Sequence, residues 1–224
     1  MKLSKADFTN KPTSLYNGCI SEWWPAIDAN KKVLNFKKGE LIFREGEPVL
    51  GMYFMVTGVV KVHKHWIEDK ELIIRFASEN DYIGHRGLST NHDVYPISAT
   101  TLVESTICFL DLNFFNATLK VNPDFMFRFL LFFADELRLS EQRMRDLAHM
   151  PVKERVMKTL ITIQTKFGTD ANGFINFDIS RQDIAAYTGA AYETVYKILA
   201  EFTGSNLIKT DGKRIGVIPQ PLNQ

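Results

Sequence analysis

The chain has little of several features that would assign a protein to a class at once. Only two of its 224 residues are cysteine, Cys19 and Cys108, and their separation favours no disulfide framework, zinc site or iron–sulfur cluster. No apolar run approaches the roughly 20 residues that span a bilayer. The N-terminal residues lack the apolar block of a secretory signal. We therefore expect a protein of the reducing cytoplasm, with no membrane partner.

Neither the net charge nor a catalytic motif assigns the chain to a functional class. The formal net charge is +1, with a slight basic excess from Pro151 onward, so charge alone does not predict nucleic-acid binding. The sequence shows no Ser/His/Asp order, phosphate-cradling glycine loop or metal-spaced cluster. We expect a protein that is not an enzyme, with no metal site and no predicted cofactor.

The sequence pattern changes twice along the chain. From about Val33 to Leu112, short apolar or alternating runs are separated by turn residues, which is typical of a β-sandwich or barrel. We assign residues 1–112 to a sensor barrel with an N-terminal helix. Residues 113–150 form the second part, dominated by one long helix over 123–148 that Pro123 begins. Residues 151–224 form a compact helical region with a terminal hairpin.

The long helix carries a seam that suits pairing with a second copy. Apolar residues recur at alternating steps of four and three, with one polar interruption, as in the a and d positions of a coiled coil. The seam comprises Met126, Leu130, Phe133, Leu137, Ser140, Met144 and Leu147. The alternative is an amphipathic helix that packs only on its own domain.

The most informative segment begins at Ser180, a good helix N-cap, with Asp183 at the third helical position. A short helix must stop at Gly189, and a second follows over about 191–202. Asp211–Gly212 then predicts a hairpin turn between two short strands. Helix, turn, helix and wing occur in the order of a winged DNA-binding domain.

The second helix carries residue types that suit the edges of base pairs. Its N-terminal half is the part that enters the major groove in such domains. Glu193 can accept from cytosine N4, Lys197 can donate to guanine or phosphate, and Arg181 can hold a backbone phosphate near the free amides of its helix. The predicted DNA-binding residues are Ser180, Arg181, Tyr192, Glu193, Tyr196 and Lys197.

From about Val33 onward the chain resembles the Crp/Fnr superfamily of bacterial regulators. Five segments carry the resemblance in order: KKGELIFREGEP, MYFMVTGVVKV, NDYIGHRGL, VNPDF and ISRQDIAAYTGAAYETVYKILAEF. The resemblance implies an α+β fold: a double-stranded β-helix, which is a cyclic-nucleotide-binding-type jelly-roll barrel, then a long dimerisation helix and a winged helix-turn-helix. It also implies a homodimer through residues 123–148, inverted-repeat operators in double-stranded DNA, and contact with RNA polymerase.

Two departures from the family pattern concern specificity. The recognition helix of the family often reads Arg-Glu-Thr-Val followed by Arg. Here Tyr192 and Lys197 replace the arginines, so the operator is expected to differ from the common family site.

Members that respond to cyclic AMP carry Gly-Glu-Leu and Arg-Ser-Ala in the barrel, where Glu accepts from ribose and Arg pairs with phosphate.

The matching positions here are a poor cyclic AMP site. His85 replaces the carboxylate, Ile97 replaces the arginine, and only Arg86 could pair with an anion. The effector-pocket residues implied by the resemblance are Gly84, His85, Arg86, Ser98, Ala99 and Ser140. We expect an effector other than cyclic AMP, an unknown small molecule.

Other sensor chemistries stay open or are disfavoured. The oxygen-sensing members use an N-terminal cysteine cluster that this chain lacks. Haem-binding members use an axial histidine, for which His63, His65, His85 and His92 qualify by residue type alone. His63 and His65 share one face of a predicted strand, but with no third ligand in sequence reach a solvated strand face is favoured over a metal pair.

The sequence thus predicts a homodimeric, DNA-binding transcription regulator with an effector-sensing barrel. Two alternatives remain at this point: an effector-independent regulator with a vestigial pocket, and a ligand-binding module whose C-terminal domain docks a protein partner. Steep salt dependence of binding would separate DNA from a protein partner, since phosphate neutralisation releases counterions.

Overall fold

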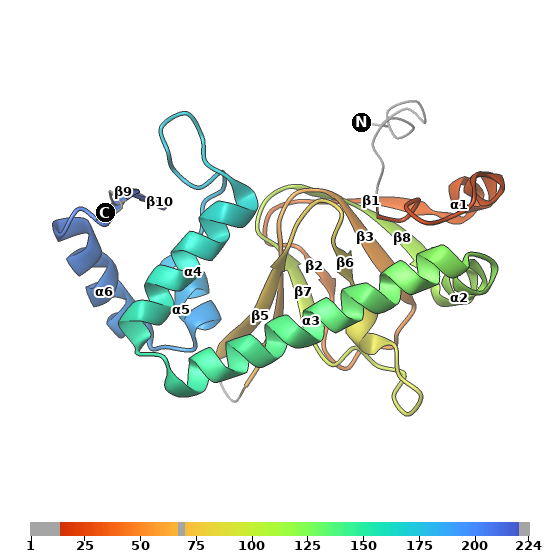
Figure 1. Cartoon of the computed structure of the whole chain (residues 1–224), viewed down its shortest axis with the longest axis horizontal. Helices are drawn as coiled ribbons and strands as arrows, with labels where there is room; N and C mark the ends of the chain where they lie inside the picture. Colours follow the sequence, from red (N-terminus) through yellow and green to blue (C-terminus); the bar gives the residue numbers. More distant parts are fainter. Residues whose placement is uncertain (1–13, 67–69, 220–224) are drawn as a thin grey trace. The chain divides into compact units, whose positions relative to one another are not determined.

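The structure of the chain, a computed structural model, describes residues 14–66 and 70–219. It divides into two compact units, one of residues 1–62 and 76–137 and the other of residues 63–75 and 138–224 (Figure 1). The boundary between Leu137 and Arg138 falls inside the long helix α3, Pro123–His149. The three domain ranges expected from sequence, 1–112, 113–150 and 151–224, stay a prediction.

Two four-stranded sheets occupy the region before residue 112, in the orders β1-β8-β3-β6 and β2-β7-β4-β5. The pairs β1/β8, β3/β8, β3/β6 and β2/β7 are antiparallel. The strands are β1 (Lys32–Phe36), β2 (Leu41–Phe43), β3 (Gly51–Thr57), β4 (Val60–His65), β5 (Glu71–Ala77), β6 (Tyr82–Ile83), β7 (Ser98–Thr101) and β8 (Ser105–Asp111). The expected β-rich N-terminal half is confirmed.

The central strand β3 is buried along almost its whole length. Residues 51–56 of β3 are buried without a break, as expected for a strand covered on both faces. Gly58 closes the turn to β4 with φ +97°, and a Cβ atom there would lie 2.2 Å from Ser105 Oγ. Only glycine accepts both the left-handed backbone and this close approach.

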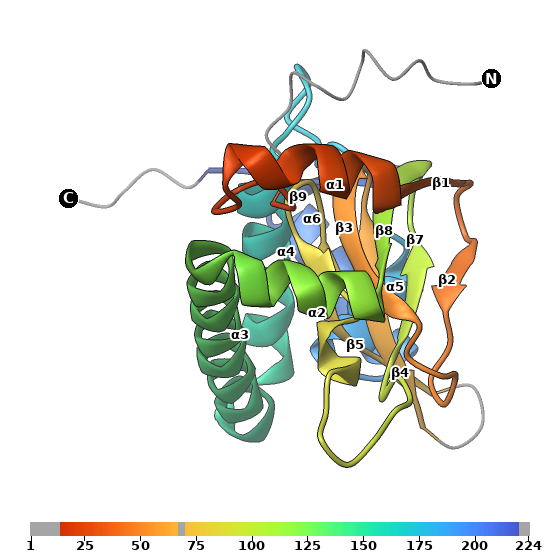
Figure 2. The ribbon, with the colours of Figure 1, turned by 90° about the vertical axis from the view of Figure 1, so that its right-hand side faces the viewer.

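Three helices complete the first unit. They are α1 (Trp24–Asn30), which follows a 3₁₀ turn at Ser21–Trp23, then α2 (Leu112–Val121) and the start of α3. Asp111 caps α2 by accepting from Phe114 N at 3.0 Å. Trp23 stacks on Phe114 and donates to Thr118 Oγ1 at 3.1 Å, so α1 and α2 lie together (Figure 2). Among the described residues, no helix is both long and apolar enough to cross a bilayer.

The second unit contains the predicted helix-turn-helix and wing. Besides the end of α3 and residues 63–75, its elements are α4 (Val152–Phe167), α5 (Arg181–Thr188), α6 (Tyr192–Gly204), β9 (Ile208–Asp211) and β10 (Arg214–Val217), the last two strands pairing antiparallel. Helix α6 and α3 match their expected ranges within two residues at each end. The α+β fold, with barrel, long helix and winged helix-turn-helix in that order, is confirmed.

Candidate nucleic-acid interface and sensor residues

The first helix of the helix-turn-helix is fixed at both ends by local chemistry. Ser180 Oγ accepts from Asp183 N at 2.9 Å, a cap worth about 1 kcal/mol. Gly189 ends α5 in the left-handed region with φ +61°. The Ser180 side chain therefore serves as a helix cap, and its predicted contact with DNA stays a prediction.

Helix α6 buries one face and exposes the other. Val195, Leu199 and Phe202 are buried against the rest of the unit. All four predicted recognition residues are exposed: Glu193 and Lys197 lie opposite the buried face, and Tyr192 and Tyr196 lie along its edge. The rings of Tyr192 and Tyr196 lie 6.3 Å apart on adjacent turns, so the exposed face combines aromatic and charged groups.

Arg181 lies where α5 begins and contacts two neighbouring elements. Its Nη1 donates to Gly212 O at the wing turn, at 3.3 Å, and its guanidinium lies 6.0 Å from the Tyr196 ring. The helix start, the recognition helix and the wing are therefore neighbours on one surface. Sequence reasoning missed Lys213, an exposed cation at the wing turn that its place after Asp211–Gly212 could have revealed.

The wing is held by the loop between α4 and α5. Arg214 pairs with Asp170 and lies 4.3 Å from the Phe174 ring. The backbone amide of Phe174, which donates to Asp170 Oδ1 at 3.0 Å, is the main cause that lowers the pKa of Asp170, with a further contribution from Arg214. Since Arg214 is held in this way, Lys213 is the better candidate for a phosphate contact.

Residues 84–87, which we call the sensor loop, contact α3 within the first unit. Gly84 has φ +88°, and the next three residues, His85–Gly87, form a short 3₁₀ turn. Arg86 Nη2 lies 3.3 Å from Glu136 Oε2, and the buried His85 has Nε2 3.8 Å from the same oxygen. The His85 ring also packs edge-on against Phe132 at 4.8 Å. The one arginine of this loop is therefore paired with a carboxylate of the chain.

Of the remaining predicted pocket residues, Ser98 and Ala99 lie in the barrel and Ser140 does not. Ser98 Oγ accepts from Glu45 N at 2.9 Å, and Ala99 is buried in β7 beside Phe43. Tyr95 is 1% exposed, stacks on Phe43 at 4.1 Å and donates to Gly51 O at 2.9 Å. Added Cβ atoms at Gly84 and Gly87 would lie 3.4 and 3.3 Å from Tyr95 Cε1. Ser140 is half-buried on α3 in the second unit.

The histidines proposed as axial haem ligands differ in environment. His85 is 2% exposed, whereas His92 is exposed in the loop before β7. The expectation of a solvated strand face is wrong for His63, which is 3% exposed, and right for His65. The reason is the β4–β5 pairing, which places Glu71 beside His63 at 2.8 Å and which spacing along one strand does not reveal.

Comparisons with known proteins agree with this architecture. Residues 33–122 match the cyclic nucleotide-binding domain, and residues 154–221 match the Crp-like helix-turn-helix domain. A CRP-like cAMP-activated global transcriptional regulator of Mycobacterium tuberculosis is 28% identical over 194 residues, covering 85% of this chain and 85% of that protein. The anaerobic regulatory protein of Bacillus subtilis is 25% identical over 201 residues, covering 89% and 83%.

Solved structures show the same fold at lower identity. The c-di-GMP responsive global regulator CLP of Xanthomonas campestris has a TM-score of 0.75 at 18% identity, covering 86% of this chain and 96% of that one. FixK2 of Bradyrhizobium japonicum has a TM-score of 0.74 at 22% identity, covering 84% and 93%. With its two domain matches in the family's order and relatives named as transcription regulators, the chain belongs to the Crp/Fnr superfamily.

Proposed function

We propose that this regulator binds an inverted-repeat operator as a homodimer and reads each half-site with α6 in the major groove. The observation that carries the proposal is the two-sided nature of α6. Its apolar face is buried, while Tyr192, Glu193, Tyr196 and Lys197 remain exposed immediately after the Gly189 turn. A helix anchored on one face and polar on the other is what major-groove entry requires.

Each exposed group has a distinct role in this proposal. Glu193 accepts from cytosine N4, and Lys197 donates to a guanine edge or to a phosphate. Arg181, the amides at the start of α5 and the wing residue Lys213 hold the sugar–phosphate backbone and set the register. Tyr192 stands where arginine is usual in the family, so the preferred half-site differs from the common family site.

The homodimer is supported by the exposed seam of α3. Leu130 is 61% exposed, Leu137 62% and Met144 63%, all at seam positions. Large apolar side chains in such a row favour burial against a partner. Phe125 and Phe129 are instead buried in the core of the first unit, so the helix has separate faces for its own domain and for a second copy. By family resemblance we also propose a cytoplasmic location and contact with RNA polymerase.

We propose further that the barrel does not use cyclic AMP, although two relatives are named as cAMP-activated. Arg86 is paired with Glu136, and Ile97 stands where those members carry the phosphate-binding arginine. A specific observation favours the alternative of a vestigial pocket: Tyr95, Phe43 and the sensor-loop glycines pack closely. In that case the regulator acts without a small-molecule effector in the barrel.

DNA selection followed by fluorescence anisotropy tests the DNA-binding proposal. The chain should enrich an inverted repeat from random duplexes, with affinity that falls steeply as salt rises. The Glu193→Ala/Lys197→Ala double variant should lose at least tenfold in affinity for that repeat.

A matched control removes one acid and one base elsewhere in the same domain. Lys153→Ala/Glu201→Ala deletes an exposed ion pair between α4 and α6, which contributes about 0–1 kcal/mol, and should bind the operator as wild type does. Equal affinity of all three proteins would refute the assigned residues. Absence of any salt-dependent duplex binding would refute the function itself.

A further inference from the structure

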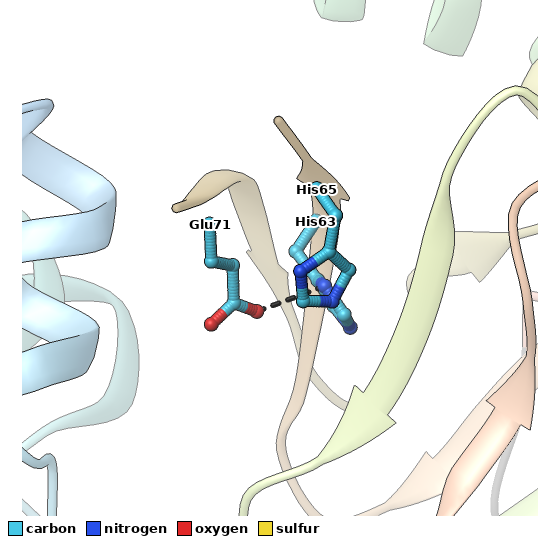
Figure 3. A group of neighbouring side chains, drawn as sticks. All are labelled: His63, His65 and Glu71. Atoms are coloured by element: carbon cyan, nitrogen blue, oxygen red, sulfur yellow. Dashed lines mark ion pairs between the residues drawn. The ribbon is translucent and has the colours of Figure 1, made fainter. Parts of the chain in front are cut away.

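Three side chains with metal-binding atoms meet at the β4–β5 hairpin (Figure 3). His63 and His65 project from the same face of β4, because side chains alternate along a strand. Glu71 comes from the start of β5, which pairs with β4. One ligand atom from each of the three lies within 4.8 Å of the other two.

The hairpin itself holds this group together. Near its turn, Trp66 N donates to Lys70 O at 2.7 Å. His63 Nδ1 lies 2.8 Å from Glu71 Oε1, and the His63 and His65 rings are 5.2 Å apart at an interplanar angle of 83°. Two imidazoles and one carboxylate therefore converge from neighbouring strands, with His63 buried and His65 exposed.

This donor set has a specific chemistry. Two imidazole nitrogens and a carboxylate oxygen form the three-ligand set of many zinc sites, which keep a fourth position for water. With bonds of about 2.0–2.1 Å, tetrahedral ligand atoms lie about 3.3 Å apart, so the widest separation in the group, at most 4.8 Å, must close by up to about 1.5 Å. His65 is the exposed member of the group, so its side chain is the one placed to supply that movement.

We propose that His63, His65 and Glu71 bind one divalent transition-metal ion of the zinc class. The competing explanation is a plain ion pair between His63 and Glu71, which needs no contribution from His65. The two explanations differ in what His65 does: it is a ligand in the first, and an ordinary surface residue in the second.

Within the second unit, the strand that carries Glu71 is linked by hydrogen bonds to the helix-turn-helix. Arg143 on α3 donates to Ile73 O and Ile74 O of β5, and also to Tyr187 O of α5 at 2.5 Å. Its guanidinium lies 4.0 Å from the Tyr187 ring. The strand that begins with Glu71 is therefore joined through one side chain to the helix that precedes the recognition helix.

If the metal and DNA each favour one of two conformations of the protein, metal binding changes the affinity of the protein for DNA. DNA binding then changes the affinity of the protein for the metal by the same factor. This coupling rests on the proposed function, whereas the metal site does not. The metal ion is then the input of the regulator, or one of its inputs.

Isothermal titration of the full metal-free chain with Zn²⁺ at pH 7.5, in the absence of DNA, tests the site. We expect one ion per chain with a dissociation constant of about 1 μM or tighter. His65→Asn and Glu71→Gln should each weaken binding at least tenfold, and His92→Asn, which changes an exposed histidine that is not part of this group, should leave it unchanged. Since His65 is exposed, His65→Asn should fold even if Glu71→Gln does not.

Two results would overturn the site: no binding tighter than about 100 μM, or binding that His65→Asn leaves intact. A Co²⁺ absorption spectrum supplies an independent reading, since tetrahedral nitrogen and oxygen ligation gives intense visible bands that His65→Asn should abolish.

Operator affinity with and without Zn²⁺ tests the coupling. We expect at least a fivefold change for wild type and none for His65→Asn, and an unchanged wild-type affinity would overturn the regulatory role. Loss of zinc binding with intact operator binding refutes this inference alone. Stoichiometric zinc binding without operator binding refutes the proposed function alone.

Discussion

Replacement of Gly189 by alanine should loosen the helix-turn-helix by about 1–2 kcal/mol. The left-handed backbone at Gly189, φ +61°, costs an L-residue about 1–2 kcal/mol. The new Cβ would lie 2.9 Å from Leu147 Cδ2, the end of a flexible side chain, so adjustment adds about 0.5–1.5 kcal/mol. A gain of about 0.4–1 kcal/mol from the stiffer unfolded chain offsets part of this cost.

Two variants control for the separate contributions. Gly204→Ala changes a glycine at the end of α6 that has no positive φ and nothing within 4 Å of its added Cβ, so it should be neutral or slightly stabilising. Gly189→Asn brings the same Cβ contact but a residue that tolerates the left-handed region, so its cost should lie between wild type and Gly189→Ala.

Hydrogen exchange of the α5 amides, residues 181–188, measures the loss of local stability in the helix that Gly189 ends. A local reading is needed because a two-unit chain need not unfold in one transition. A loss of 1–2 kcal/mol corresponds to about 5–30-fold faster exchange through local opening. Wild-type exchange rates in Gly189→Ala would refute the backbone argument, and equal acceleration by Gly189→Asn would assign the whole cost to the Leu147 contact.

Three further predictions follow from single residues. Leu130→Glu places a charge on the exposed seam of α3 and should dissociate the homodimer at micromolar concentration in sedimentation velocity; an unchanged dimer would move the interface elsewhere. Arg181→Ala should weaken binding to every duplex alike and reduce the slope of log affinity against log salt by about 1, and an unchanged slope would argue against a phosphate contact. Burial raises the pKa of Cys19 from 9.0 to about 11, so its thiolate fraction at pH 8 falls about 100-fold. Iodoacetamide should therefore label Cys19 about 100-fold more slowly than an ordinary cysteine in peptide mapping, and rapid labelling would contradict its burial.

The elements with strong local signals could be predicted from the sequence. Pro123 and the alternating apolar steps define α3, and Ser180 with Gly189 defines α5 by its two ends. Asp211–Gly212 marks the wing turn, where Gly212 has φ +57°. These features depend on residues within a few positions of one another, so spacing alone reveals them.

The contacts that define the sensor side could not be predicted in this way. Arg86 meets Glu136 across 50 positions of sequence, and His63 meets Glu71 across a hairpin whose register the sequence leaves open. A one-residue slip in register would turn Glu71 to the other face of the sheet. The burial of His63 depends on the same register, which explains why a solvated face was the wrong expectation for it.

Helix α3 carries a separate attachment on each side of the unit boundary. Glu136 binds Arg86 of the sensor loop in the first unit, and Arg143 binds β5 and α5 in the second. They are seven positions apart, which is about two turns or roughly 10 Å of helix. The same helix carries the exposed seam, so the proposed dimer contact, the sensor-loop contact and the contact with α5 all lie on one element.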